Sequence, residues 1–189
     1  MGEPTRRLIV GISGASGAIY GVRMLEALRA AGWESHLVVS RAARRTIATE
    51  TDQDFEAIRA LASVAHPIED IGASIASGSF RADGMVIAPC SIRTAGEIAS
   101  CVTTSLLTRA ADVTLKERRR LVLMVRETPL HLGHLRMLTA LAEAGAIIAP
   151  PVPAFYARPA DLGAMVDHSV GRVLDLFGIE TSLVRRWEG

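Results

Sequence analysis

The residues best suited to chemistry stand directly behind short apolar segments of the chain. The segment at residues 8–12 leads into Ser13-Gly14-Ala15-Ser16-Gly17, and a helical pattern follows at once. Glycines let a backbone approach a ligand closely, and the free amides at a helix N-terminus attract anions such as phosphate. The sequence therefore predicts a mononucleotide phosphate site here, with hydroxyl donors from Ser16 and from Ser40, which follows the second apolar segment. The alternative is a tight strand-to-helix turn that binds nothing.

This glycine pattern differs from the fingerprint of dinucleotide-binding proteins. The glycines at 11, 14 and 17 are spaced three and three. The second apolar segment ends in Ser40 and Arg41, where an NAD-binding protein carries an acidic residue for the ribose. A nicotinamide-dependent dehydrogenase is therefore the weakest of the possible functions.

Polar residues also follow the third and fourth apolar segments. Ser91 stands just behind residues 85–88 and begins a helical pattern, so it either caps that helix or contacts a ligand. Arg126 and Glu127 follow residues 121–125 directly. They are either a surface ion pair or functional charges. We favour a functional role, because the carboxyl ends of parallel strands are where such sheets bind ligands.

Three further features are candidates for a ligand site. Lys116 is the single lysine beside twenty arginines, which suggests either a bias of genome composition or a need for a compact ammonium. The stiff apolar segment at 150–156 ends in Tyr156 and predicts a ligand wall or a subunit contact. Trp187 lies near the C-terminus, and because a large aromatic ring is costly to leave in water, we expect it to pack against another part of the protein.

Metals, nucleic acids and membranes are disfavoured as partners. His131 and His134 stand three apart at a helix start without a third ligand at suitable spacing, and Cys90 and Cys101 lack metal-site spacing. The formal net charge of +1 argues against binding nucleic acid through bulk charge. No apolar run approaches the roughly 20 residues of a membrane span, and no secretory signal is evident, so we expect a cytoplasmic protein.

Short apolar strands alternate with helical patterns along the chain. We predict strands at residues 8–12, 36–39, 85–88, 121–125 and 146–148, and helices at 18–31, 41–49, 93–101, 105–117, 135–144 and 162–177. Strands that are apolar throughout are typical of a parallel sheet buried on both faces. The sequence therefore predicts a single α/β domain over residues 1–189. Its sheet is doubly wound and mainly parallel, with helices on both faces, and a C-terminal tail at about 178–189 closes the site.

From about Arg7 to its C-terminus, the chain resembles the flavin prenyltransferases of the UbiX type. The order and spacing of eight short motifs carry the resemblance, namely Gly14-Ala15-Ser16-Gly17-Ala18, Ala48-Thr49-Glu50-Thr51-Asp52, Pro89-Cys90-Ser91, Arg109-Ala110-Ala111-Asp112, Leu115-Lys116-Glu117-Arg118, Arg126-Glu127-Thr128-Pro129-Leu130, Pro153-Ala154-Phe155-Tyr156 and Arg186-Trp187.

The resemblance implies an enzyme with a Rossmann-like or flavodoxin-like fold. It would bind reduced FMN and dimethylallyl phosphate, join the dimethylallyl group to flavin N5 and C6, and release phosphate. The product, prenylated FMN, would serve UbiD-type decarboxylases in ubiquinone biosynthesis or in the decarboxylation of aromatic acids. The family forms large homo-oligomers, so a dodecamer is expected, and no metal is needed. Monophosphate and diphosphate donors both stay open.

The resemblance also implies roles for particular residues. The residues expected to hold FMN are Gly14, Ala15, Ser16, Ser40, Ser91, Ile92, Arg93, Thr94 and Arg126. Those expected around the prenyl phosphate are Arg109, Lys116, Glu127, Tyr156 and Arg172, some of them from a neighbouring subunit. The expected catalytic residues are Glu127, Lys116, Ser16, Glu50 and Trp187.

The expected roles follow from the charges that develop in the reaction. Lys116 and the arginines would stabilise the departing phosphate, and Glu127, expected beside Lys116, would manage a proton. The Trp187 ring would face the allylic cation.

Two other flavoprotein functions fit the same fold. An FMN-dependent cysteine decarboxylase should carry a catalytic histidine and an asparagine-rich substrate motif, which the sequence after Pro151 lacks. A non-catalytic flavin-carrying subunit of a decarboxylase complex would need no second phosphate pocket. The presence of Lys116, Glu127 and Tyr156 speaks against that second alternative.

Overall fold

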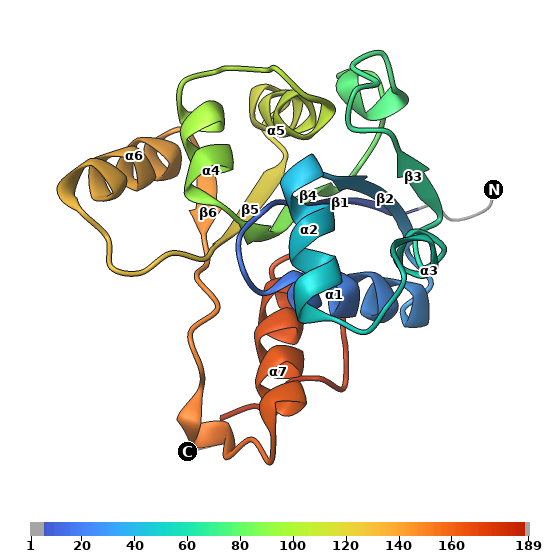
Figure 1. The fold of residues 1–189 in the computed structure, drawn as a ribbon, viewed down its shortest axis with the longest axis vertical. Helices are drawn as coiled ribbons and strands as arrows, with labels where there is room; N and C mark the ends of the chain where they lie inside the picture. Colours follow the sequence, from blue (N-terminus) through green and yellow to red (C-terminus); the bar gives the residue numbers. More distant parts are fainter. Residues whose placement is uncertain (1–5, 188–189) are drawn as a thin grey trace.

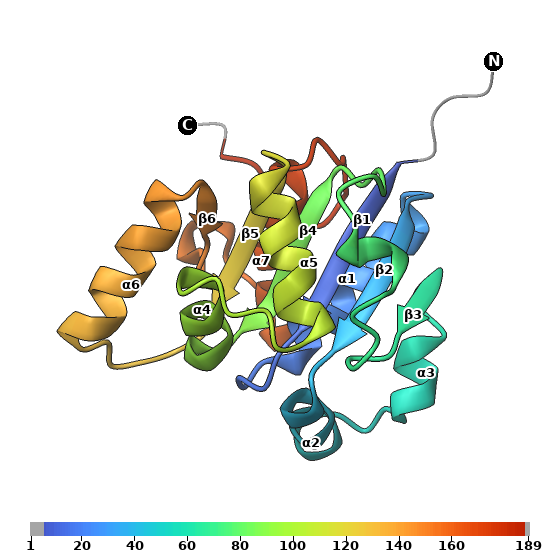
Figure 2. The ribbon, with the colours of Figure 1, turned by 90° about the horizontal axis from the view of Figure 1, so that it is seen from above.

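A computed structural model describes residues 6–187 of the chain, and its centre is one parallel sheet of six strands (Figures 1 and 2). The strands lie in the order β3-β2-β1-β4-β5-β6, with every neighbouring pair parallel. Their bounds are β1 Arg7–Ile12, β2 Glu34–Val39, β3 Val64–His66, β4 Gly84–Cys90, β5 Arg120–Val125 and β6 Ala146–Ile148. The chain order reverses between β1 and β4, which confirms the predicted doubly wound α/β fold.

Seven α-helices cover and flank the sheet. Their bounds are α1 Ala18–Ala30, α2 Arg41–Glu50, α3 Phe55–Arg59, α4 Ile92–Ala99, α5 Leu106–Lys116, α6 Leu132–Glu143 and α7 Leu162–Asp175. Helices α1 and α7 pack together on one face of the sheet, while α4 and α5 lie on the other face, where α4 contacts α6 (Figures 1 and 2). Among the described residues, no helix has the length and apolarity that a membrane crossing needs.

The core consists of two apolar layers, one on each face of the sheet. Leu8, Val10 and Ile12 of β1 belong to the layer under α1 and α7, whereas Ile9 belongs to the layer under α5. Successive side chains of a strand point to opposite faces, so a strand between two layers must be apolar at every position. This is why the central strands were visible in the sequence.

The elements at the edge beyond β2 were missed. Strand β3 has only three residues and carries an exposed valine, and helix α3 has only five residues, so neither shows a periodic pattern. Strand β2 begins two residues earlier than predicted, because the polar Glu34 and Ser35 pair with Arg7 and Leu8 of β1. The predicted elements elsewhere lie where expected, within about three residues at each end.

The chain after α7 folds back along that helix. Gly171 lies so close to Leu183 and Val184 that a Cβ atom there would be only 2.5 Å from the Val184 side chain. Arg186 then pairs with Asp175 of α7 at 3.0 Å. The part of the predicted tail that the structure describes, residues 178–187, therefore packs against α7, and residues 188 and 189 lie outside the described part.

Candidate functional site

A cavity of about 520 Å³ opens at the carboxyl edge of the sheet. It lies where the first turns of three helices converge, beside the point at which the chain order of the strands reverses. Its lining residues are Gly14, Ser40, Arg41, Ala42, Ile68, Glu69, Ser91, Arg93, Thr94, Glu97, Thr104, Ser105, Leu107 and Thr108. Open α/β sheets bind ligands at such a point.

Each of the three helices presents a serine-capped N-terminus to this cavity. Ser40 accepts the backbone N–H of Ala43 at the start of α2, at 3.1 Å. Ser91 caps α4 in the same way at 3.2 Å, and Ser105 caps α5 at 3.4 Å. A helix N-terminus carries about half a positive charge and unpaired N–H groups, so three of them around one cavity favour a multiply charged anion such as phosphate.

A buried serine holds the strand ends that present these caps. The Ser13 hydroxyl donates to the carbonyl of Pro89 at 2.8 Å and accepts the N–H of Ser91 at 2.7 Å. It therefore joins the end of β1 to the end of β4 and fixes where α4 begins. Sequence reasoning did not single out Ser13, because a serine inside a glycine-rich turn carries no signal of its burial.

The start of α1 is already occupied by a carboxylate of the chain. Glu50, at the end of α2, accepts the N–H groups of Gly17 at 2.7 Å and Ala18 at 3.1 Å. The expectation of free amides for phosphate at this helix is therefore wrong for Gly17 and Ala18, whose N–H groups bond Glu50. Gly14 packs so closely on Ala42 of α2 that a side chain would collide there, and Gly17 has a φ of 99°. The turn itself therefore needs both glycines, whether or not they also contact a ligand.

Glu50 is held as an ionised carboxylate. Burial acts to raise its pKa, but hydrogen bonds from Ser16, Gly17 and Ala18 act more strongly in the opposite direction. The positive charge of Arg126 adds to them, so the pKa of Glu50 lies below its ordinary value. Ser16 and Arg126 thus influence the charge of Glu50, and all three are residues that the sequence assigned to the site.

The two charged residues behind β5 differ in their contacts. The backbone N–H of Arg126 donates to the carbonyl of Cys90 at 3.0 Å, which ties the end of β5 to β4. The Glu127 side chain is exposed and accepts the N–H of Thr128 at 3.0 Å. Burial raises the pKa of the Cys90 thiol to about 12, so that sulfur stays protonated and is no nucleophile.

Lys116 lies far from Glu127 within one chain. Helix α5 begins beside the cavity and runs back along the sheet, so Lys116 at its end lies near the amino end of β5. Glu127 follows the carboxyl end of that strand, and six residues of strand span roughly 20 Å. The expectation that Glu127 lies beside Lys116 is therefore wrong for residues of the same chain.

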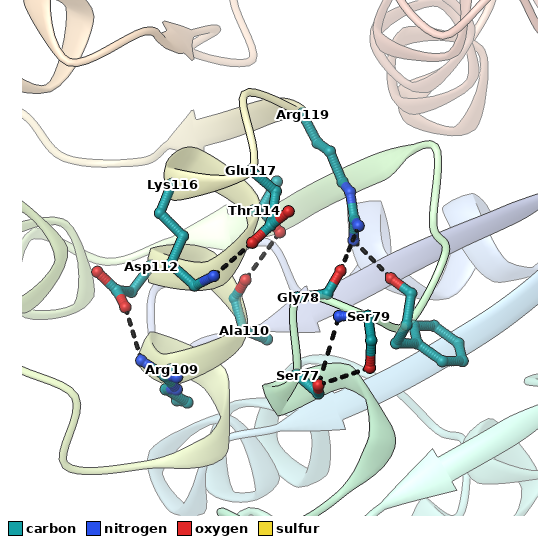
Figure 3. Close-up of polar contacts among 11 residues, drawn as sticks. Ser77, Gly78, Ser79, Arg109, Ala110, Asp112, Thr114, Lys116, Glu117 and Arg119 are labelled. Atoms are coloured by element: carbon teal, nitrogen blue, oxygen red, sulfur yellow. Dashed lines mark hydrogen bonds and ion pairs between the residues drawn. The ribbon is translucent and has the colours of Figure 1, made fainter.

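The charged side chains of α5 and of the turn behind it pair with close neighbours in the chain or with the adjoining turn (Figure 3). Lys116 pairs with its neighbour Glu117, and Arg109 pairs with Asp112 at 2.9 Å. Arg119 donates to the carbonyls of Gly78 and Phe80 at 2.7 and 2.6 Å and so holds the adjoining turn against the end of α5. Both predicted phosphate ligands on this helix, Arg109 and Lys116, are partly exposed and are paired with carboxylates of the same chain.

A second polar group gathers around α7 on the opposite face of the sheet. The Tyr156 hydroxyl lies 3.2 Å from Nε2 of His168, and the Tyr156 ring meets the Trp187 ring edge-on, with centroids 5.5 Å apart. Asp175 pairs with both Arg172 and Arg186, and these guanidinium groups, Arg186 first, hold the pKa of Asp175 below its ordinary range. We call Tyr156, His168, Arg172, Asp175, Arg186 and Trp187 the C-terminal cluster.

The pair of histidines at the start of α6 serves as a helix cap. His131 accepts the N–H groups of Gly133 and His134 through Nδ1, at 3.0 and 3.4 Å, and the two imidazole rings lie with centroids 3.6 Å apart at a tilt of 31°. The part of the chain that the structure describes contains no group of three or more histidine, cysteine, aspartate or glutamate side chains suited to a metal.

The structure thus places only some of the predicted site residues in the cavity. Gly14, Ser40, Ser91, Arg93 and Thr94 line the cavity, while Ala15 and Ile92 stand beside these residues in the chain. Sequence reasoning missed Ser105 and Thr108, although a serine three residues ahead of a threonine at a helix start is a recognisable capping pattern. It also missed His168, which stands alone in the helical pattern of α7.

Comparison with known proteins identifies the family of this chain. The family described as Flavoprotein matches residues 2–175. Flavin prenyltransferase UbiX of Escherichia coli (strain K12) is 60% identical over 187 residues, covering 97% of this chain and 99% of that protein. The crystal structure of AnUbiX (PadA1) in complex with FMN and dimethylallyl pyrophosphate superimposes with a TM-score of 0.97 at 49% identity, covering 98% of this chain and 99% of that one.

Two further structures bear on the assembly and on the alternative function. A dodecameric FMN-dependent UbiX-like decarboxylase from Escherichia coli O157:H7 has a TM-score of 0.94 at 47% identity, covering 97% of this chain and all of that one. The FMN-dependent cysteine decarboxylase TvaF has a TM-score of 0.64 at 19% identity, over 78% of this chain and 91% of that one, and shares the fold alone. The chain belongs to the flavoprotein family and, within it, to the UbiX-type flavin prenyltransferases.

Proposed function

We propose that this chain is an enzyme that transfers the dimethylallyl group of dimethylallyl phosphate to N5 and C6 of reduced FMN. Its products would be prenylated FMN and phosphate. Family membership supports the reaction, since relatives of almost the same length carry the name flavin prenyltransferase UbiX. A related structure that holds FMN and dimethylallyl pyrophosphate together supports both substrates.

The observation that carries the proposal is the convergence of three serine-capped helices on one cavity. The caps Ser40, Ser91 and Ser105 would surround the phosphate of FMN, which is a doubly charged anion without a metal partner. The cavity volume of about 520 Å³ lies within the roughly 300–1,000 Å³ typical of small-molecule sites. The donor set therefore fits the phosphate of a flavin mononucleotide.

The group at that edge would hold the flavin ring. The charge of Arg126 and the hydroxyl of Ser16 both act to lower the pKa of Glu50. The carboxylate and the guanidinium would give this wall of the site charges of both signs, which would orient the polar edge of the ring. Ala15, Ile92, Arg93 and Thr94 would complete the flavin-binding surface.

A second copy of the chain would complete the prenyl-donor site. In one chain the expected phosphate ligands are spread over α5, the segment behind β5 and the C-terminal cluster. Val152, Phe155 and Leu162, which flank Tyr156, are 72%, 74% and 73% exposed, as expected of a surface that another chain covers. The dodecameric relative supports a homo-oligomer of twelve chains.

The tail at 178–187 would close the site by holding Trp187 against Tyr156.

The reaction needs cations near the leaving phosphate and a group that transfers protons. The C–O bond of the donor breaks with both electrons staying on phosphate, where Arg109, Lys116 and Arg172 would stabilise the charge. One carbon of the dimethylallyl group replaces the hydrogen on N5. Another replaces the hydrogen on C6 as the donor double bond takes up a proton. Glu127 would handle these protons, and the face of Trp187 would stabilise the allylic cation by about 0.5–2 kcal/mol.

The test is the reaction itself. The protein is incubated without oxygen with reduced FMN and dimethylallyl phosphate, and in parallel with the diphosphate, and the extracted flavin is weighed by mass spectrometry. We expect a flavin heavier by C5H8, and no change when FMN is kept oxidised. An unchanged flavin mass with both donors overturns the proposed function.

The proposed recipient of the product is a UbiD-type decarboxylase. Adding the product to such an enzyme in its cofactor-free form should restore its activity. The cysteine decarboxylases share only the fold with this chain, and a mere flavin carrier has no use for the second set of phosphate ligands, so neither alternative is favoured.

A further inference from the structure

His168 is a buried polar residue with one specific side-chain partner. It lies on α7 and is 8% exposed, and its Nε2 atom is 3.2 Å from the Tyr156 hydroxyl. The imidazole and phenol rings meet edge-on, with centroids 5.6 Å apart. The Trp187 ring contacts Tyr156 in the same edge-on way, so the tyrosine ring is held from two directions.

The direction of this hydrogen bond decides what Tyr156 offers to a ligand. A phenol has one hydrogen to donate, and a phosphate oxygen can only accept. If Nε2 of His168 lacks a hydrogen, the phenol donates to it and turns only lone pairs outward. If Nε2 carries the hydrogen, His168 donates, and the phenol hydrogen is free for an anion.

We propose that His168 is a positioning residue that donates from Nε2 to Tyr156 and so directs the Tyr156 hydroxyl hydrogen at the phosphate of the prenyl donor. The inference rests on the proposed function, which places Tyr156 and Arg172 against that phosphate. Arg172 follows His168 by four residues, so the two side chains lie on one face of α7. Helix α7 would thus carry one residue that contacts the phosphate itself, Arg172, and one that acts on it through the Tyr156 hydroxyl, His168.

A purely structural role for His168 makes a different prediction. A histidine that merely fills space would stabilise α7 whatever stands at position 156, so its replacement would act independently of Tyr156. A histidine that works through the phenol has no effect on the donor once the hydroxyl is gone. A double-mutant cycle separates the two cases.

The cycle measures the dissociation constant of dimethylallyl phosphate for the FMN-loaded protein by calorimetry. We expect Tyr156→Phe to weaken binding about 10-fold or more, since it removes a hydrogen bond to a charged group. His168→Leu should weaken it about 3- to 10-fold, because the hydroxyl remains but is no longer directed. The double variant should bind as Tyr156→Phe does.

Two controls keep the result specific. Ser169→Ala removes the bond from the neighbouring hydroxyl to the carbonyl of Met165 on the same helix and should leave donor binding unchanged. His168→Gln keeps an N–H donor at this position and should recover most of the lost affinity. If it folds normally but binds as weakly as His168→Leu, the directed hydrogen bond is refuted.

The remaining outcomes are also decisive. If the two single variants lose equal amounts of donor affinity and the double variant loses the sum, the proposal is overturned and His168 is a packing residue. If the wild-type protein binds the donor but transfers nothing, the proposed function fails while the cycle still decides the role of His168. If the FMN-loaded wild type binds no dimethylallyl phosphate, both proposals are wrong.

Discussion

Single residues at the carboxyl edge satisfy helix ends and strand ends before they contact any ligand. Ser13 joins β1 to β4, and Glu50 caps α1. The charge on Glu50 therefore has a structural role in addition to any role toward the flavin.

Glu50→Gln tests that structural role through its pH dependence. The pKa of Glu50 in the fold lies below its unfolded value of about 4.3, so the ionised carboxylate stabilises the fold above that pH. This stabilisation is lost as the pH falls through the folded pKa. We expect Glu50→Gln to lower the free energy of unfolding by about 0.5 kcal/mol at pH 7, because water screens the exposed carboxylate and reduces the advantage of a charged over a neutral acceptor.

Urea unfolding at a fixed protein concentration measures this difference. It should shrink as the pH falls below about 4, because protonated Glu50 resembles glutamine. Glu56→Gln, which breaks the exposed pair with Arg59 on α3, is the matched control and should change little. A difference for Glu50→Gln that is the same at pH 3 and pH 7 would show that the charge contributes nothing.

Glu127→Gln tests the proton-handling role. Glutamine keeps the shape and hydrogen-bonding reach of the side chain, so FMN affinity should be unchanged. Prenyl transfer in a single turnover at saturating donor should fall at least about 100-fold, the low end of what a positioned acid–base group supplies. Glu143→Gln on the outer end of α6 serves as the control. Near-normal turnover in Glu127→Gln would leave Glu127 without a chemical role.

Among the elements, the three capped helices α2, α4 and α5 determine what the cavity binds. If their N-termini hold the phosphate of FMN, the loss of a cap should weaken the binding of a flavin only when that flavin carries the phosphate. We expect Ser105→Ala to weaken FMN binding about 10-fold, because a hydrogen bond to a charged group is lost. Riboflavin, which lacks the phosphate, should bind the variant and the wild type equally.

Fluorescence titration of both flavins measures the ratio of the dissociation constants of the variant and the wild type. Thr46→Ala on the outer side of α2 removes a hydroxyl that bonds only its own helix, and it should change neither affinity. Equal weakening of riboflavin and FMN by Ser105→Ala would show that α5 does not face the phosphate.

The sequence predicted the elements that have a strong pattern. The central strands are apolar at every position because both faces are buried, and the helices between them are long enough to show a period. Strand β3 and helix α3 were missed because three and five residues carry too little pattern. The start of α6 was placed three residues late, since a histidine cap at His131 is an uncommon signal.

The candidate site was predictable in its residues but not in their arrangement. Ser40 and Ser91 follow strands, and the sheet rule places them together at one edge. The occupation of the α1 N-terminus by Glu50 depends on how α2 ends, which no local pattern encodes. The separation of Lys116 from Glu127 depends on the direction of α5 and becomes visible only once the strand order is known.

At the level of the whole molecule, one chain holds a flavin-sized cavity but leaves the expected donor ligands on separate surfaces. Lys116 and Glu127 stand near opposite ends of β5, roughly 20 Å apart. A site that needs both must take one of them from a second copy. Two variants that are each inactive should then complement one another when they share an oligomer.

The most direct measurement mixes Lys116→Ala and Glu127→Gln subunits after reversible dissociation and follows the formation of prenylated flavin. A site that combines Glu127 of the first variant with Lys116 of the second contains both native residues. We expect each variant alone to be nearly inactive and the mixed oligomers, verified by native mass spectrometry, to recover part of the wild-type activity. Verified mixed oligomers that stay as inactive as either variant would contradict a site shared between chains.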